Sequence, residues 1–144
     1  MSNRSLREVI EGQRLVSGTE QMSVREAARR MVEHRVGALP ILRGQAMVGI
    51  FTERDVLARV VVAGLDPDRT TVAQVMTHNP LSISIEAPLE RALRMMRSHS
   101  IRHLPVLEGT LPVGVVTTRD ALGEEWVRFE AEQDLEDQVA ALLR

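Results

Sequence analysis

The chain has 144 residues, of which 44% are hydrophobic and 26% charged, and its formal net charge at pH 7 is −2. Cysteine, lysine and tyrosine are absent and aromatic residues make up 2%. This composition excludes disulfides, thiolate or lysine nucleophiles, lysine-based phosphate loops and aromatic stacking platforms for single-stranded nucleic acid. No stretch is apolar enough to span a bilayer or to form a signal-peptide core, so the sequence predicts a cytoplasmic protein with no membrane contact.

An internal repeat organises the chain. Residues 22–59 align with residues 87–124 at a constant offset of 65 positions, and residues 5–10 echo residues 71–76 at an offset of 66. The shared phrases include VGIFTERD at 48–55 and VGVVTTRD at 113–120. A repeat of this size must stack on its copy to bury its apolar face. We therefore predict repeat 1 over residues 5–64, a linker over 65–70, repeat 2 over 71–123 and an acidic amphipathic C-terminal helix over 124–144.

Each repeat is predicted to form a strand, a helix, two strands and a second helix. The first strands are expected near residues 15–17 and 81–85, and the helices that follow show apolar residues at helical spacing from Val24 and from Leu89. Pro40 and Pro105 exclude a longer helix, and pairs of β-branched segments joined by glycine turns follow. The fold class is therefore α+β: two βαββα repeats packed sheet to sheet about a pseudo-twofold axis, with two similar clefts between them.

The Thr-x-x-Asp segment at the start of each second helix has two interpretations. Thr52 with Asp55, and its copy in repeat 2, fit a helix N-cap with an acidic residue in the first turn. The same geometry fits a nucleotide, because the helix start and the hydroxyl can face a phosphate while a short carboxylate accepts the ribose hydroxyls. Capping alone gives no reason for the arginine that precedes the aspartate in both copies.

The tandem pattern RVGALPIL…VGIFTERD and SIRHLPVL…VGVVTTRD resembles a pair of cystathionine-β-synthase (CBS) domains, the disc-like arrangement called a Bateman module. The resemblance covers about residues 5–123. It implies regulation rather than catalysis, through binding of AMP, ADP, ATP or another adenosyl ligand such as NAD(H) or S-adenosylmethionine. It also implies a homodimer of discs and an effector protein that responds to the ligand.

The resemblance also implies which residues line the two clefts. The residues expected to contact ribose or phosphate are Thr52, Arg54 and Asp55 in repeat 1, and Thr117, Arg119 and Asp120 in repeat 2. The Asp120 cleft would add Val36, Gly37, Ala38, Arg102 and His103, and the Asp55 cleft would add Ile101, Arg102, Thr77, Pro80 and Leu81. Gly37-Ala38 stands where the other repeat has Arg102-His103, so we expect two sites of unequal affinity.

Two further features have competing interpretations. His99 and His103 have the spacing of metal ligands on a helix, but they straddle a helix-to-strand junction, so no metal site is expected. His34 and His99 are instead expected to stabilise helix C-termini. The apolar positions of the tail, which suit an amphipathic helix, are Trp126, Phe129, Leu135, Val139 and Leu142. That helix packs on its own module or on a second copy, or it docks another protein.

The sequence thus favours a regulatory module that binds adenosine nucleotides and signals to a partner. The alternative is a ligand-free oligomerisation or protein-interaction scaffold with vestigial nucleotide sites. Catalysis is not expected, because the repeat accounts for the candidate catalytic groups. Nucleic-acid binding is not expected either, because the arginines are spread among acidic residues instead of forming a basic patch.

Overall fold

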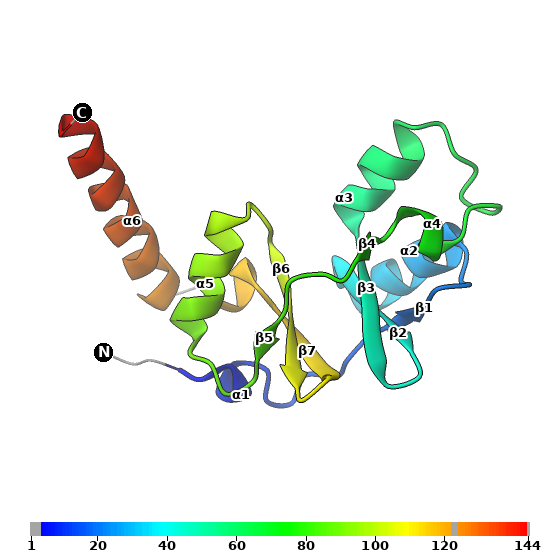
Figure 1. The fold of residues 1–144 in the computed structure, drawn as a ribbon, viewed down its shortest axis with the longest axis horizontal. Coiled ribbons are helices and arrows are strands. Elements are labelled where there is room, and N and C mark those ends of the chain that lie inside the picture. Colours follow the sequence, from blue (N-terminus) through cyan, green and yellow to red (C-terminus); the bar gives the residue numbers. More distant parts are fainter. Residues whose placement is uncertain (1–3, 122–123, 144) are drawn as a thin grey trace.

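The computed structural model describes residues 4–121 and 124–143, and Figure 1 shows two lobes side by side with a long C-terminal helix at one end. The elements in chain order are α1 (Leu6–Val9), β1 (Gly18–Thr19), α2 (Val24–His34), β2 (Ala38–Arg43), β3 (Ala46–Thr52), α3 (Glu53–Asp55), η1 (Val56–Val61), α4 (Val72–Val75), β4 (Thr77–His78), β5 (Ile83–Ser84), α5 (Leu89–Ser98), β6 (His103–Glu108), β7 (Leu111–Thr117), η2 (Thr118–Ala121) and α6 (Glu124–Leu142). Both lobes follow the strand-helix-strand-strand-helix order, so the predicted α+β fold of two βαββα repeats is confirmed.

The two sheets repeat each other in order and register. The first has the order β1-β2-β3-β4 and the second β5-β6-β7, with the first strand parallel to its neighbour and the other pairs antiparallel. Gly18 pairs with Ile41, and Ile83 pairs with Val106 at the equivalent position. The first strand of repeat 2 falls within the predicted range, but that of repeat 1 begins after it, at Gly18. Because Gly18 has no side chain, the Ile41 methyl packs against its backbone, 3.1 Å from where a Cβ would stand.

The short helices α1 and α4 are exchanged between the lobes. The Leu6 N–H of α1 donates to Ala87 O at 3.0 Å, and the Val72 N–H of α4 donates to Met22 O at 2.8 Å, which are equivalent bonds in the two repeats. Leu6 is buried in the core of the second lobe and Val72 in that of the first. Each sequence repeat therefore completes the core of the other, and the exchange obeys the pseudo-twofold symmetry.

Each lobe has its own apolar core, and β3 contacts β7 where the lobes meet. The first core consists of Val24, Ala27, Met31, Leu39, Ile41, Phe51, Val60, Val72, Val75 and Met76. The second consists of Leu6, Ile10, Ile83, Ile85, Ala87, Leu89, Ala92, Leu93, Met96, Leu104, Val106, Val116 and Phe129. Complete burial of one such large side chain contributes about 1.5–3 kcal/mol, so these clusters dominate the stability of both lobes.

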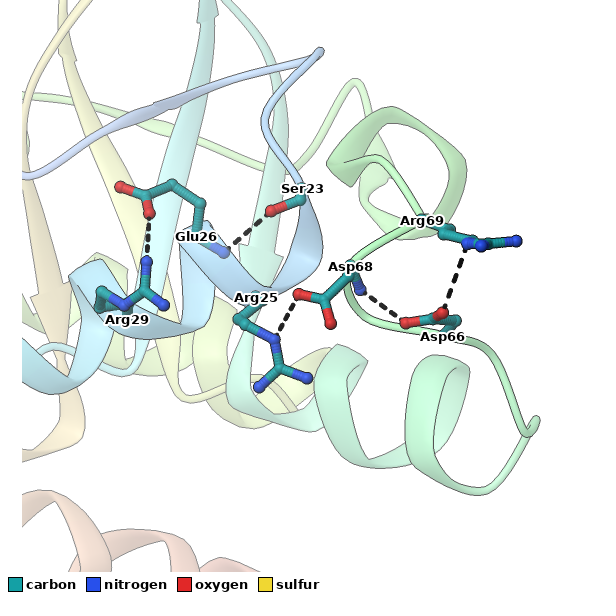
Figure 2. A network of polar contacts seen from close by, with 7 residues as sticks. All are labelled: Ser23, Arg25, Glu26, Arg29, Asp66, Asp68 and Arg69. Atoms are coloured by element: carbon teal, nitrogen blue, oxygen red, sulfur yellow. Dashed lines mark hydrogen bonds and ion pairs between the residues drawn. The ribbon is translucent and has the colours of Figure 1, made fainter.

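Polar side chains stand at the ends of the long helices. Ser23 caps α2, with its Oγ accepting from the Glu26 N–H at 3.1 Å, while the Glu26 carboxylate turns toward Arg29 (Figure 2). His34 lies in the last turn of α2. His99 is the C-cap of α5, and its Nδ1 lies 3.0 Å from Met95 O. Both histidines therefore sit at helix C-termini as expected.

The predicted linker at residues 65–70 is fastened to α2. The Arg25 guanidinium pairs with the Asp68 carboxylate, and the backbone N–H of Arg25 donates to Pro67 O at 3.0 Å. Figure 2 shows Asp66 completing the turn by accepting from the Asp68 N–H at 2.9 Å and pairing with Arg69 at 3.8 Å. The side-chain hydrogen bond between Arg25 and Asp68 raises the pKa of Arg25 and lowers that of Asp68. Because these groups are exposed, they fix the path of the linker more than they stabilise the fold.

The C-terminal helix α6 enters the core of its lobe near its start. Phe129 is buried in the second core, whereas Leu135 and Leu142 are 61% and 84% exposed. Asp137 ties α6 to α5 through an ion pair of 2.7 Å with Arg97. The side chain of Trp126 lies outside the described residues. Among the helices of the described residues, none combines the length and apolar character needed to cross a membrane.

Candidate functional site

A pocket of about 660 Å³ opens between the lobes beside the start of α3. One wall comes from repeat 1, where β3 ends and α3 begins, and the other from residues 77–81 and the segment leading into β6. The lining residues are Ile50, Thr52, Glu53, Arg54, Asp55, Leu57, Ala58, Arg59, Thr77, Pro80, Leu81, Ser100, Ile101, Arg102, His103 and Pro105. Small-molecule sites typically measure roughly 300–1,000 Å³, so this pocket has room for a nucleotide.

Thr52 and Asp55 form a reciprocal cap at the start of α3. The Thr52 N–H donates to Asp55 Oδ2 at 2.9 Å, and the Thr52 hydroxyl lies 3.1 Å from the same oxygen. The Asp55 N–H in turn donates to Thr52 Oγ1 at 3.2 Å. Asp55 is only 8% exposed, yet it lines the pocket. The capping interpretation is thus confirmed, and it leaves Asp55 Oδ1 outside the cap.

Arg59 joins the two walls of the pocket. Its Nε lies 3.6 Å from Asp55 Oδ1, and its Nη1 donates to Val75 O at 3.1 Å and to Met76 O at 3.2 Å. These carbonyls belong to the last residue and the C-cap of α4, where a cation is electrostatically favourable. Arg59 therefore fastens the Asp55 wall to the segment that continues into β4 and the second wall.

Gly37, Glu53 and His103 meet between the repeats. A Cβ at position 37 would lie 2.5 Å from Glu53 Oε1 and 2.7 Å from His103 Nε2, so a larger residue there would displace the ends of both side chains. The Glu53 N–H also donates to Gly37 O at 3.0 Å. Burial lowers the pKa of His103 below its usual 6.5, against the opposing effect of the Glu53 carboxylate. The imidazole is therefore neutral at pH 7 and offers hydrogen bonds there instead of charge.

Most residues predicted from sequence come together in this one pocket. They are Thr52, Arg54, Asp55, Thr77, Pro80, Leu81, Ile101, Arg102 and His103. His103, expected in the Asp120 cleft, lines the Asp55 pocket, while the charges of Arg119 and Asp120 also affect its pKa. Glu53 and Arg59 were not singled out from sequence. A difference between the repeats could have pointed to Arg59, because the equivalent position in repeat 2 holds Glu124.

The second Thr-x-x-Asp segment has the same cap. The Thr117 N–H donates to Asp120 Oδ2 at 2.8 Å, and the Asp120 N–H donates to Thr117 Oγ1 at 3.3 Å. Of the other residues predicted for this cleft, Val36 packs against the first core and Ala38 is buried in the β2–β3 ladder, opposite Thr52. Arg119 directly precedes Asp120 within η2. The two repeats therefore present the same capped carboxylate in different surroundings.

Paired βαββα repeats with a pocket between them define a tandem CBS module. The chain matches the CBS domain family at residues 12–62 and 72–126, and it belongs to that family. It is 33% identical over 117 residues to the uncharacterized protein YlbB of Bacillus subtilis, an alignment that covers 80% of this chain and 78% of YlbB.

A larger relative and a solved structure extend the comparison. The CBS domain-containing protein CBSCBSPB3 of Arabidopsis thaliana is 36% identical over 112 residues, which are 77% of this chain but only 20% of that protein. The CBS domain protein PAE2072 from Pyrobaculum aerophilum, whose structure is complexed with AMP, superposes with a TM-score of 0.77 at 29% identity. That superposition covers 90% of this chain and 99% of PAE2072. The module thus occurs both as nearly a whole protein and as a fifth of a larger one.

Proposed function

We propose that the chain is a regulatory module that binds an adenosine nucleotide in the Asp55 pocket. The observation that supports this most is the pocket itself, where a buried carboxylate, apolar side chains and two arginines with no partner among the described residues meet in a space of nucleotide size. The structure of the related PAE2072 is complexed with AMP, which makes AMP, ADP and ATP the first ligands to test. NAD(H) and S-adenosylmethionine share the adenosine group and complete the panel.

The positions of the lining residues support a role for each part of the ligand. Asp55 Oδ2 is engaged in the cap, but a carboxylate has about four lone-pair positions, so Oδ1 can accept from the ribose hydroxyls. Arg54 directly precedes Asp55 and lines the same pocket, where its guanidinium can bind a phosphate through charge-assisted hydrogen bonds. Leu81 and Ile101 offer apolar surface to the base. The nucleotide would thus contact both repeats at once.

Replacing Asp55 by alanine tests this function. Hydrogen bonds to a charged group contribute about 1.5–3 kcal/mol, so we expect nucleotide affinity to fall about tenfold or more in isothermal titration calorimetry. Asp120→Ala is the matched control, because it removes the same helix cap from the other repeat. We expect it to leave the affinity of the Asp55 pocket nearly unchanged.

Two outcomes would contradict the proposal. One is a folded Asp55→Ala protein that binds nucleotide as tightly as the wild type. The other is a wild-type protein that binds none of the five ligands, which would favour the alternative of a protein-interaction scaffold with vestigial sites. Thermal unfolding of both variants shows whether they remain folded.

Regulation would follow from the position of the pocket between the two repeats. A ligand held by both walls stabilises the arrangement of the lobes in which those walls are correctly spaced, and it shifts the population toward that arrangement. An effector protein that recognises this arrangement would then respond to the nucleotide. The Asp120 cleft, with its different surroundings, would bind more weakly or prefer another adenosyl ligand.

We further infer that the module forms a homodimer, because large apolar side chains remain exposed on its helices. Val61 and Val62, at the end of η1, are 64% and 78% exposed, and α6 adds a second exposed apolar set. Burial of such side chains against a second copy would contribute roughly 25 cal/mol per Å².

A further inference from the structure

The charged groups that line the Asp55 pocket differ in how far they are already paired. Three arginines and two acidic residues line it, namely Arg54, Arg59, Arg102, Glu53 and Asp55. Arg59 is committed to Asp55 and to the two carbonyls at the end of α4. The Glu53 carboxylate lies against Gly37 and His103, at the junction of the repeats.

Arg54 and Arg102 remain available to a ligand. Within residues 4–121 and 124–143, neither guanidinium has an ion-pair or hydrogen-bond partner, and both side chains are exposed. They stand on opposite walls, because Arg54 belongs to α3 of repeat 1 and Arg102 to the segment just before β6 of repeat 2. A ligand that pairs with both must therefore carry negative charge across the pocket.

We propose that Arg102 makes the Asp55 pocket selective for an adenosine nucleotide with at least two phosphates, an inference that rests on the proposed function. With the ribose held at Asp55, the first phosphate reaches Arg54 on the adjoining residue of the same helix. A second phosphate extends away from this wall toward repeat 2, where the unpaired guanidinium of Arg102 can bind it bidentately. AMP ends at the first phosphate and leaves Arg102 unpaired.

This selectivity belongs to one cleft only. The position equivalent to Arg102 in repeat 1 is Gly37, which offers no charge. The position equivalent to Arg59 is Glu124, which adds a negative charge to the sequence near Asp120. Position 37 therefore supplies no cation of the kind that Arg102 supplies to the Asp55 pocket.

Titration calorimetry with AMP, ADP and ATP, in magnesium-free buffer of constant ionic strength, tests the proposal. We expect the wild type to bind ADP about tenfold or more tightly than AMP, as one added charge-assisted contact implies. In Arg102→Gln the affinity for ADP should fall more than the affinity for AMP, so that this advantage disappears. Arg102→Lys keeps the charge without the bidentate geometry and should retain part of the advantage.

Arg91→Gln is the control for overall charge, since Arg91 is an exposed residue of α5 that does not line the pocket. It should leave the preference for ADP intact. Equal affinity of the wild type for AMP and ADP, a preference that persists in Arg102→Gln, or equal losses in Arg102→Gln and Arg91→Gln would each overturn the proposal. AMP binding without any gain for ADP leaves the proposed function standing, whereas the absence of all nucleotide binding removes both.

Discussion

His103 connects the two repeats at the scale of a single side chain. It lines the Asp55 pocket, its Nε2 approaches Gly37, and charged groups of both repeats surround it, namely Glu53, Arg102, Arg119 and Asp120. Burial is the largest of the influences on its pKa and lowers it below 6.5. The unfolded chain therefore binds the His103 proton at a higher pH than the folded protein does.

This difference predicts how stability depends on pH. Stability rises with pH wherever the unfolded state binds more protons, so the stabilisation from neutral His103 is present above pH 6.5 and is lost as the pH falls toward the folded pKa. We expect the Tm of the wild type to fall between pH 7.5 and 5.5, and the fall to be smaller in His103→Gln. Thermal unfolding at several pH values measures both. The other histidines are unchanged in this variant, so equal slopes for the two proteins would contradict the assignment.

The sequence predicts some residues of the pocket better than others. Thr52 and Asp55 could be located because they recur in register, and the structure places them as a cap at the pocket wall. Arg59 and Glu53 could not be located in this way, because their roles depend on contacts with residues that are distant in sequence or on the other repeat. A residue that breaks the repeat, as Arg59 does, is the kind of signal that would have found them.

At the scale of an element, the Gln13 side chain stands in repeat 2 where repeat 1 has the edge strand β4. In repeat 1, β4 pairs with β3, with Thr77 opposite Ile50. At Val115 of β7, the position equivalent to Ile50, the side-chain amide of Gln13 takes the place of the pairing strand. Its Nε2 donates to Val115 O at 3.2 Å, and its Oε1 accepts from the Val115 N–H at 2.7 Å. A side chain thus pairs both polar backbone groups of one residue at the sheet edge.

Gln13→Ala is expected to destabilise the second lobe. Each hydrogen bond contributes about 0.5–1.5 kcal/mol net, and Gln13 is exposed, so water replaces part of the loss and about 1 kcal/mol should remain. A loss of this size lowers the Tm by a few degrees in thermal unfolding. Gln45→Ala, in the exposed turn between β2 and β3, is the matched control and should leave the Tm unchanged. Equal melting temperatures for the wild type and Gln13→Ala would show that the amide has no structural role.

The elements themselves were largely predictable, but their partners were not. Helical and strand periodicity placed α2, α5 and the two central hairpins because each has a buried face long enough to show its period. α1 and α4 are too short to reveal which core they enter, and the structure exchanges them between the lobes. Sequence similarity between repeats identifies equivalent elements, but it does not show whether each one packs within its own repeat.

At the scale of the whole molecule, the exchange makes the lobes interdependent while α6 extends beyond them. Among the described side chains at this end of the chain, the large apolar residues that remain exposed are Leu135, Val139 and Leu142 of α6 and Leu143, which follows it. With 3.6 residues per turn they lie on one face, and Asp137 lies about half a turn away, on the side where it pairs with Arg97 of α5. The apolar face therefore points away from the helix's own lobe, which leaves a second copy or another protein to cover it.

We expect that face to hold the homodimer together. A chain that ends at residue 131 keeps Phe129 in the second core, so its Tm should change little, whereas its mass in light scattering should fall from dimer to monomer. Leu135→Ser combined with Leu142→Ser tests the same face without shortening the helix, and it should also give a monomer. Asp134→Ser, on the polar side of α6, should remain dimeric. If the truncated chain is still a dimer, the exposed residues at the end of η1 hold it instead. If the full chain is already monomeric while it stays folded, α6 is free to dock a different protein.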